Sequence, residues 1–215
     1  MIEIKETCYK GTRILLGNEK RNLINKMINV LLKEGFQEIQ IPIIQHQEIF
    51  KNKVGEENNN LMFNFTDRGN RNLCLAPEYT AVIQQLAKTT FKNQKDVKLF
   101  YVAECFRGEK PQAGRYRQFT QLGVEILNPT PNGKPTAWST YIRYVAFIAQ
   151  CLIEKKTIHY KLNFDVTRGL DYYKEGKGFE ITCDELGSSK QVCGGGEYDG
   201  GIGFAIGIDR LLQLL

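Results

Sequence analysis

The clearest hydrophobic pattern in the chain is an alternation of period two on both sides of a polar loop. Tyr101, Ala103 and Cys105 alternate with Val102 and Glu104, a period of two that is typical of a strand. Gly108, Pro111 and Gly114 interrupt the pattern and predict a loop. Residues 118–126 then resume an extended apolar run, so the two stretches predict an antiparallel pair of strands.

Before this pair, the pattern predicts a helix followed by shorter elements. Apolar residues recur at helical spacing from Leu23 to Leu32, with Asn18 as the N-cap and Gly35 as the stop. The other elements predicted there are a strand at 36–41, a polar loop at 54–60, a hairpin of 62–66 with 72–75, and a helix from Pro77 and Glu78 to about Lys88.

After the pair, the pattern predicts further strands and two helices. They are a helix at 137–154, a strand at 158–166, a hairpin of 179–183 with 190–198, and a helix at 205–215 with Arg210 near its middle. The glycines at 194–196 permit close approach of the backbone to a ligand, although a simple bulge explains them equally well.

Composition limits the class of protein. The chain has 215 residues, of which 42% are hydrophobic, enough for one domain spanning 1–215. Its net charge of +5 suits RNA or a nucleotide, but an ordinary lysine-rich surface explains it equally well. Because the chain lacks a signal peptide and a long apolar run, we expect a cytoplasmic protein that does not enter the membrane. None of the six cysteines forms a C-x-x-C pair, so no metal site is predicted.

The central pair of strands carries the first candidate chemistry. Arg107 ends the first strand and Phe119 begins the second, and an arginine beside an aromatic ring can hold a phosphate and a base. A solvated basic hairpin is the alternative interpretation of the same residues.

Three ordered blocks resemble a known family. They are similar to motifs of class II aminoacyl-tRNA synthetases of the histidyl branch, and they read FRGEKPQAGRYRQFTQLGVE, RGLDYY at 168–173, and GFAIGIDRLLQLL at the C-terminus. The resemblance implies an α+β class II synthetase fold, with a largely antiparallel sheet flanked by helices, and a homodimer formed through the first helix and strand. Only about 40 residues separate the first two blocks, so we expect the family's insertion domain to be missing. We also expect the C-terminal anticodon-binding domain to be absent.

The resemblance also implies roles at an ATP site. Arg107 contacts the α-phosphate, Arg210 holds the γ-phosphate, and Arg168 bridges the α-phosphate and the amino-acid carboxylate, a role that Mg²⁺ can share. Phe119 stacks on adenine, while Glu109 and Arg115 lie in a loop that faces adenine and the acceptor end of tRNA. The implied cofactors are therefore ATP and Mg²⁺.

A second set of residues is implied to bind histidine. Those that accept the ammonium group are Glu78, Thr80 and Gln121, and those that enclose the imidazole are Glu125, Tyr172, Tyr173 and Tyr198. Simple packing of the tyrosines and a buried hydrogen bond at Glu125 are the alternatives. His46 and His159 belong to no motif.

Three positions depart from the family pattern. Ala76 replaces an arginine, Tyr79 replaces a glycine and Glu197 replaces an arginine, and the bulk of Tyr79 is expected to crowd the amino-acid pocket.

The predicted function is ATP-dependent activation of an amino acid, histidine above all, and its transfer to tRNA or another acceptor. The first alternative is a non-catalytic paralogue such as the regulatory subunit of ATP phosphoribosyltransferase. A degenerate binding module is the third interpretation.

Overall fold

The computed structural model describes residues 3–4, 8–15, 17–51, 53, 59–112, 114–130, 159–167, 170, 172–186 and 190–214. The predicted helix at 137–154, most of the predicted loop at 54–60, and Arg168 lie outside the described residues. No helix in the described part of the chain is long and apolar enough to cross a membrane.

The main sheet has seven strands in the order β3-β7-β8-β12-β11-β10-β9. Every neighbouring pair is antiparallel except β3 with β7, so the predicted largely antiparallel sheet is confirmed. The bounds of its strands are β3 Gln37–Glu38, β7 Val97–Phe106, β8 Gln118–Leu127, β9 Tyr160–Val166, β10 Tyr173–Cys183, β11 Gln191–Tyr198 and β12 Gly201–Gly207.

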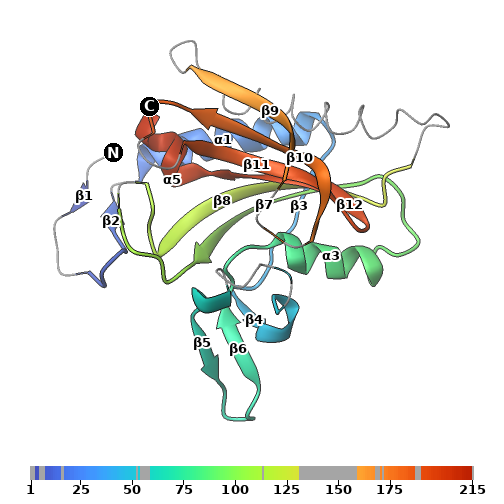
Figure 1. Ribbon diagram of the computed structural model, residues 1–215, viewed down its shortest axis with the longest axis horizontal. Helices are drawn as coiled ribbons and strands as arrows, with labels where there is room; N and C mark the ends of the chain where they lie inside the picture. The colour runs from blue at the N-terminus through green and yellow to red at the C-terminus, as the bar shows by residue number, and fades with distance from the viewer. Residues whose placement is uncertain are drawn as a thin grey trace.

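Two small sheets and several helices accompany the main sheet (Figure 1). The small sheets are β1 Glu3–Ile4 with β2 Ile14–Leu15, and β4 Ile44–His46 with β6 Asn72–Leu75 and β5 Asn64–Thr66. The helices are α1 Asn18–Lys33, α3 Thr80–Lys88 and α5 Ile208–Leu211, with 3-10 turns η1 Gln47–Ile49 and η2 Leu212–Leu214.

Most predicted elements are confirmed, with shifts at their ends. Gly17 rather than Asn18 is the N-cap of α1, and Gly35 follows the helix with φ +79°, a backbone conformation that suits glycine. The helix predicted from Pro77 begins at Thr80. The helix predicted at 205–215 is wrong for its first three residues, which complete β12, because Ala205 and Ile206 pair with Gly123 and Leu122 of β8.

The two faces of the main sheet differ in character. On one face Leu122, Val124 and Phe204 belong to an apolar core with Met27 and Leu31 of α1, which lies behind the sheet in Figure 1. Residues that are paired directly across two strands share a face. On the other face, the paired residues across β7 and β8 are Tyr101 with Gly123, Ala103 with Gln121 and Cys105 with Phe119, and Glu125 pairs with Gly203 of β12. This second face therefore combines small residues with polar ones.

Candidate active site

A pocket of about 180 Å³ opens on the face with the small and polar residues. Its walls come from the β7–β8 loop, the first residues of β8 and β11, the end of β12 and the start of α5. The residues expected at an ATP site that line it are Arg107, Glu109, Arg115, Phe119 and Arg210, and Gln121 lines it as well.

Arg107 is held at the edge of this pocket by two contacts. Its Nε donates a hydrogen bond to the carbonyl oxygen of Pro77 at 2.9 Å. Its guanidinium carbon lies 5.3 Å from the ring centroid of Phe119, a cation–π distance. The loop backbone is closed beside it, because Arg107 N donates to Arg117 O at 3.0 Å. The guanidinium is thus fixed with donors left over for an anion.

Arg210 reaches the pocket from the opposite wall. Its Nε donates to the carbonyl oxygen of Gly114 at 3.2 Å, and its Nη1 donates to that of Gln191 at 2.7 Å. Burial lowers the pKa of Arg210; the positive charges of Arg115 and Arg107 lower it further, while Glu109 opposes them. Positive charges crowded into a partly buried pocket favour an anionic ligand.

Glu109 is the acidic residue of the loop wall. Its Oε2 lies 3.3 Å from Nε of Arg115, an ion pair without hydrogen-bond geometry. The same oxygen is buried and makes no hydrogen bond. A buried acceptor in that state is available to a ligand or a cation.

Gln121 and Glu125 continue from the pocket along the same face of β8, with Gly123 between them. Oε1 of Gln121 accepts from the thiol of Cys105 at 3.2 Å. Beyond Gly123 the face carries a cluster of carboxylates and hydroxyls, which we call the acid–tyrosine cluster; it is buried except at Tyr172 and Tyr173, which are partly exposed. Its members are Glu78, Thr80, Tyr101, Glu125, Tyr172, Tyr173 and Tyr198.

Glu78 caps α3 from within this cluster. Its Oε2 accepts from Thr80 N at 2.7 Å and from Tyr172 OH at 3.1 Å, and its Oε1 accepts from Ala81 N at 3.0 Å. Burial raises the pKa of Glu78 despite these hydrogen bonds and the nearby Arg107. A carboxylate in this state gains by meeting a cation.

Glu125 is the central acid of the cluster. Its Oε1 accepts from Thr80 Oγ1 at 2.9 Å and its Oε2 accepts from Tyr198 OH at 2.7 Å. Burial raises the pKa of Glu125 to about 8, against the effect of the Tyr198 and Thr80 hydrogen bonds, and Glu78 raises it further. The side chain is completely buried, and it fits because position 203 opposite it is a glycine.

The tyrosines form the far wall of the cluster. The rings of Tyr172 and Tyr173 lie 4.6 Å apart, and each lies 6.4 Å from the ring of Tyr198. The hydroxyl of Tyr101 is buried without a hydrogen bond, and its ring occupies the space over Gly123. Sequence reasoning did not select Tyr101 as a site residue, although the alternation that puts it on the face of Cys105 was available.

Tyr79 does not join the acid–tyrosine cluster through its hydroxyl. It donates to the backbone oxygen of Glu104 at 2.9 Å, and its ring lies 5.3 Å from that of Tyr101. Tyr79 packs in a second core with Ala76 and Cys105. Its hydroxyl is thus directed at β7, while its ring packs beside Tyr101 of the acid–tyrosine cluster. That the bulk of Tyr79 crowds the amino-acid pocket stays a prediction. Glu197, the third departure from the family pattern, is buried and pairs with Lys174 of β10.

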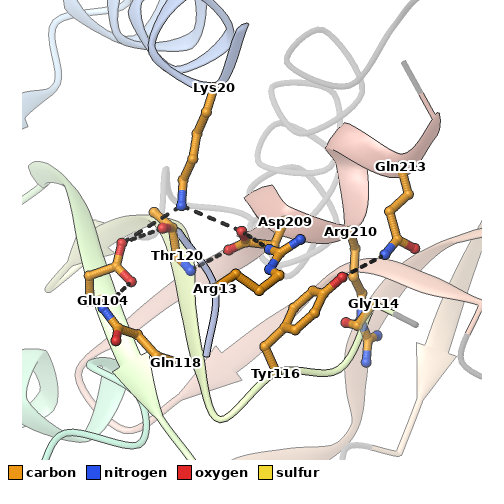
Figure 2. Close-up of polar contacts among 10 residues, drawn as sticks. All are labelled: Arg13, Lys20, Glu104, Gly114, Tyr116, Gln118, Thr120, Asp209, Arg210 and Gln213. Atoms are coloured by element: carbon orange, nitrogen blue, oxygen red, sulfur yellow. Dashed lines mark hydrogen bonds and ion pairs between the residues drawn. The ribbon is translucent and has the colours of Figure 1, made fainter. Parts of the chain in front are cut away.

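Asp209 is a second residue that sequence reasoning passed over, although it stands beside Arg210. It lines the pocket, is buried, and accepts a hydrogen bond from Thr120 N at 2.6 Å (Figure 2). The predicted site residues thus divide into the pocket and the cluster beside it, with Arg168 outside the described residues.

Comparisons with known proteins find similar sequences and similar folds. A family model described as "Histidyl-tRNA synthetase" matches residues 17–134. The histidine–tRNA ligase of Clostridioides difficile is 28% identical over 310 aligned positions, covering 96% of this chain and 74% of that protein. The alignment is longer than this chain, so the relative contains segments that find no counterpart here. The histidine–tRNA ligase of Methanococcus vannielii is 44% identical over 122 residues, covering 55% of this chain and 29% of that protein.

Solved structures resemble the whole described architecture. The apo histidyl-tRNA synthetase of Staphylococcus aureus superposes with a TM-score of 0.70 and 25% identity, covering 99% of this chain and 70% of that one. This likeness confirms the predicted class II synthetase fold. A Bacillus halodurans protein titled "ATP phosphoribosyltransferase regulatory subunit/histidyl-tRNA synthetase" has a TM-score of 0.76 at 16% identity, covering 99% of this chain and 83% of that one, which shows the fold alone.

Proposed function

Because this chain belongs to the histidyl-tRNA synthetase family, we propose that it activates histidine with ATP and transfers the activated histidine to tRNA. The observation that carries the proposal is the adjacency of two sites on one strand. β8 presents Phe119 and Gln121 to a pocket with three arginines, and it presents Glu125 to a buried cluster two residues beyond Gly123. An ATP phosphate and an amino-acid carboxylate would meet at Gln121, between the two sites.

The arginines supply what adenylate formation needs. Attack of a carboxylate on the α-phosphorus brings two anions together, and negative charge develops before pyrophosphate leaves. We propose that Arg107 holds the α-phosphate and that Arg210 holds the γ-phosphate, with Phe119 under the adenine. Both guanidiniums are fixed by carbonyl oxygens before ATP arrives, so they need little reorganisation. No general base is required, because the carboxylate of an amino acid is ionised at neutral pH.

The acid–tyrosine cluster supplies the amino-acid site. We propose that Glu78, Thr80 and Gln121 bind the ammonium group and that Glu125, Tyr172, Tyr173 and Tyr198 enclose the imidazole. A carboxylate and a hydroxyl can satisfy both ring nitrogens, and a site built this way rejects side chains that cannot make those hydrogen bonds. Burial of Glu78 and Glu125 side by side favours a ligand with positive charge.

Mg²⁺ fits the pocket as a companion of ATP. It usually binds through substrate phosphates and one or two carboxylates, and Glu109 offers a buried oxygen without a hydrogen bond. When bound, Mg²⁺ neutralises charge on the phosphates. Asp209 is a poorer ligand, because its oxygens already accept from Arg13 and Thr120.

We further propose a cytoplasmic homodimer that assembles through α1 and β3. In support, β3 is the edge strand of the main sheet and Leu32 on α1 is 53% exposed. Sedimentation equilibrium tests the dimer: a single species at the mass of two chains is expected, and a monomer at micromolar concentration contradicts it.

The decisive test of function is amino-acid-dependent ATP–pyrophosphate exchange with Mg²⁺ across all twenty amino acids. Exchange with histidine is expected, and Arg107→Ala should reduce it more than about 100-fold. Arg71→Ala is the matched control, because Arg71 pairs only with Asp67 in the exposed β5–β6 hairpin among the described contacts.

Other outcomes of this test separate the alternatives. Exchange with a different amino acid would keep the reaction and reject the assignment of the cluster to imidazole. Histidine binding by calorimetry without exchange would reject the enzyme and favour a regulatory paralogue. Exchange without charging of tRNA would point to another acceptor.

A further inference from the structure

A network of ion pairs behind the pocket joins three distant parts of the chain (Figure 2). At its centre, Oδ1 of Asp209 lies 2.6 Å from Nη2 of Arg13 and 3.4 Å from Nζ of Lys20. Its Oδ2 accepts from Thr120 N, between the pocket residues Phe119 and Gln121. One carboxylate therefore connects the N-terminal segment and α1 to β8, next to Arg210.

The same N-terminal segment grips the β7–β8 loop. The guanidinium carbon of Arg13 lies 3.4 Å from the ring centroid of Tyr116, so the two planes are in direct contact. One residue on, Arg117 N donates to Gly11 O at 2.8 Å, and Arg117 Nη1 donates to Tyr9 OH at 2.9 Å. Residues 9–13 thus hold Tyr116 and Arg117, the two residues that follow the pocket residue Arg115.

The pair of Arg13 and Asp209 at the centre of this network is costly to break, because both side chains are largely buried. Only 12% of the Arg13 side chain and 5% of the Asp209 side chain are exposed. Loss of one partner from a buried pair leaves an uncompensated charge, so the pair resists opening. Arg13 also has a planar guanidinium, which can pair with a carboxylate and stack on a ring at once, unlike the point charge of a lysine.

We propose that Arg13 is a positioning residue for the ATP site, acting through Tyr116 and Asp209. The inference rests on the proposed function for the identity of the ligand. Arg13 does not line the pocket, yet it holds the loop that carries Glu109 and Arg115 against the helix that carries Arg210. It thereby prepares the phosphate and adenine contacts before the nucleotide binds, while the acid–tyrosine cluster is built from other contacts.

The test is steady-state exchange with Arg13→Ala, varying ATP and histidine separately. The KM for ATP should rise about ten-fold, since misplaced binding groups weaken positioning, and the KM for histidine should stay within about two-fold. Arg13→Lys should fall between the wild type and Arg13→Ala, because it keeps the charge but loses the stacking. Arg71→Ala again controls for loss of an arginine.

A double-mutant cycle with Tyr116→Ala tests the route. Each single variant, Arg13→Ala or Tyr116→Ala, should raise the KM for ATP by some factor. The double variant should raise it by less than the product of these two factors, because both substitutions remove the same contact. An unchanged KM for ATP in Arg13→Ala, or equal rises in both KM values with a lowered melting temperature, overturns the proposal. If Arg13→Ala does not fold, Arg13→Lys decides by the same criterion.

Direct ATP binding separates this inference from the proposed function. If the wild type binds ATP in calorimetry but performs no exchange, the proposed function fails. The comparison of wild type with Arg13→Ala then uses the dissociation constant of ATP in place of the KM. A ten-fold weaker constant in Arg13→Ala then still supports Arg13 as a positioning residue. Absence of ATP binding by the wild type overturns both.

Discussion

Glu125 and Gly203 face each other across β8 and β12, and a Cβ at position 203 would overlap Oε2 of Glu125. The central acid of the site therefore exists in this orientation because its cross-strand partner has no side chain. The glycine here is required for space and not for an unusual backbone conformation, since its φ is not positive.

Gly203→Ala is accordingly expected to be costly. The new methyl group must displace Glu125, Val124 O or the strand itself, and overpacking of this kind costs about 1–3 kcal/mol. Urea unfolding should show the loss, and histidine binding should weaken with it. Gly17→Ala is the control, because a Cβ there meets nothing within 4 Å and only a helix N-cap is changed. Equal stability of Gly203→Ala and wild type would show that Glu125 is free to move.

The stability of the ligand-free protein should fall as the pH rises from about 4.5 to about 8. Burial raises the pKa of Glu125 from 4.5 to about 8, so over this range the folded state keeps a proton that the unfolded state has released. The unfolded state then binds fewer protons, which makes the slope of the unfolding free energy with pH negative. The contribution is fully present below the unfolded pKa and is lost as the pH passes the folded one.

Glu125→Gln isolates this effect. The amide cannot ionise, so urea unfolding at pH 5.5, 7 and 8.5 should show a shallower decline than in the wild type. Glu78 is not changed and contributes with the same sign, because its pKa is also raised by burial. Parallel pH profiles for the two proteins would refute a raised pKa at Glu125.

Histidine binding at pH 7 should release protons. Below a pKa of about 8 the carboxyl of Glu125 is largely protonated, whereas a cation or an N–H donor beside it favours the ionised form. Calorimetry in buffers of different ionisation enthalpy measures the number released. The released fraction should be smaller in Glu125→Gln, with Glu78 as the remaining source, and equal release by both proteins would place the titrating group elsewhere.

Tyr79→Phe should lower stability without changing the site. The substitution leaves the backbone oxygen of Glu104 without the hydrogen bond from the phenol, a loss of about 1 kcal/mol. Because the ring stays in place against Tyr101, the KM for histidine should remain within about two-fold. A large change in that KM would mean that the hydroxyl of Tyr79 reaches the ligand.

Sequence reasoning succeeded where a pattern was local. The alternation at 101–105 and 118–126 predicted β7 and β8, and the residues it selected at Arg107 and Phe119 lie in contact. It failed at Ala205 and Ile206, where pairing with β8 overrode a sequence that also reads as the start of a helix. Long-range pairing is not encoded in a window of neighbouring residues.

The missed residues have the same explanation. The role of Asp209 depends on its contact with Arg13, which lies 196 positions earlier in the chain, and a contact over that separation cannot be read from neighbouring residues. The bulk of Tyr79 could be read from the sequence, but the direction of its side chain could not. Which way a side chain points depends on the strand packed against it, here β7.

The pairing of β8 with β12 has a consequence for how the protein is made. Within the main sheet this ladder joins the described chain before residue 131 to the described chain after residue 158. Arg107 and Phe119 stand on the earlier side of this ladder and Arg210 on the later side, so a nascent chain cannot bind nucleotide with all three until Arg210 has emerged. A bound nucleotide would then contact both parts of the chain and stabilise their association. Two separately expressed fragments should therefore associate more readily when ATP is present.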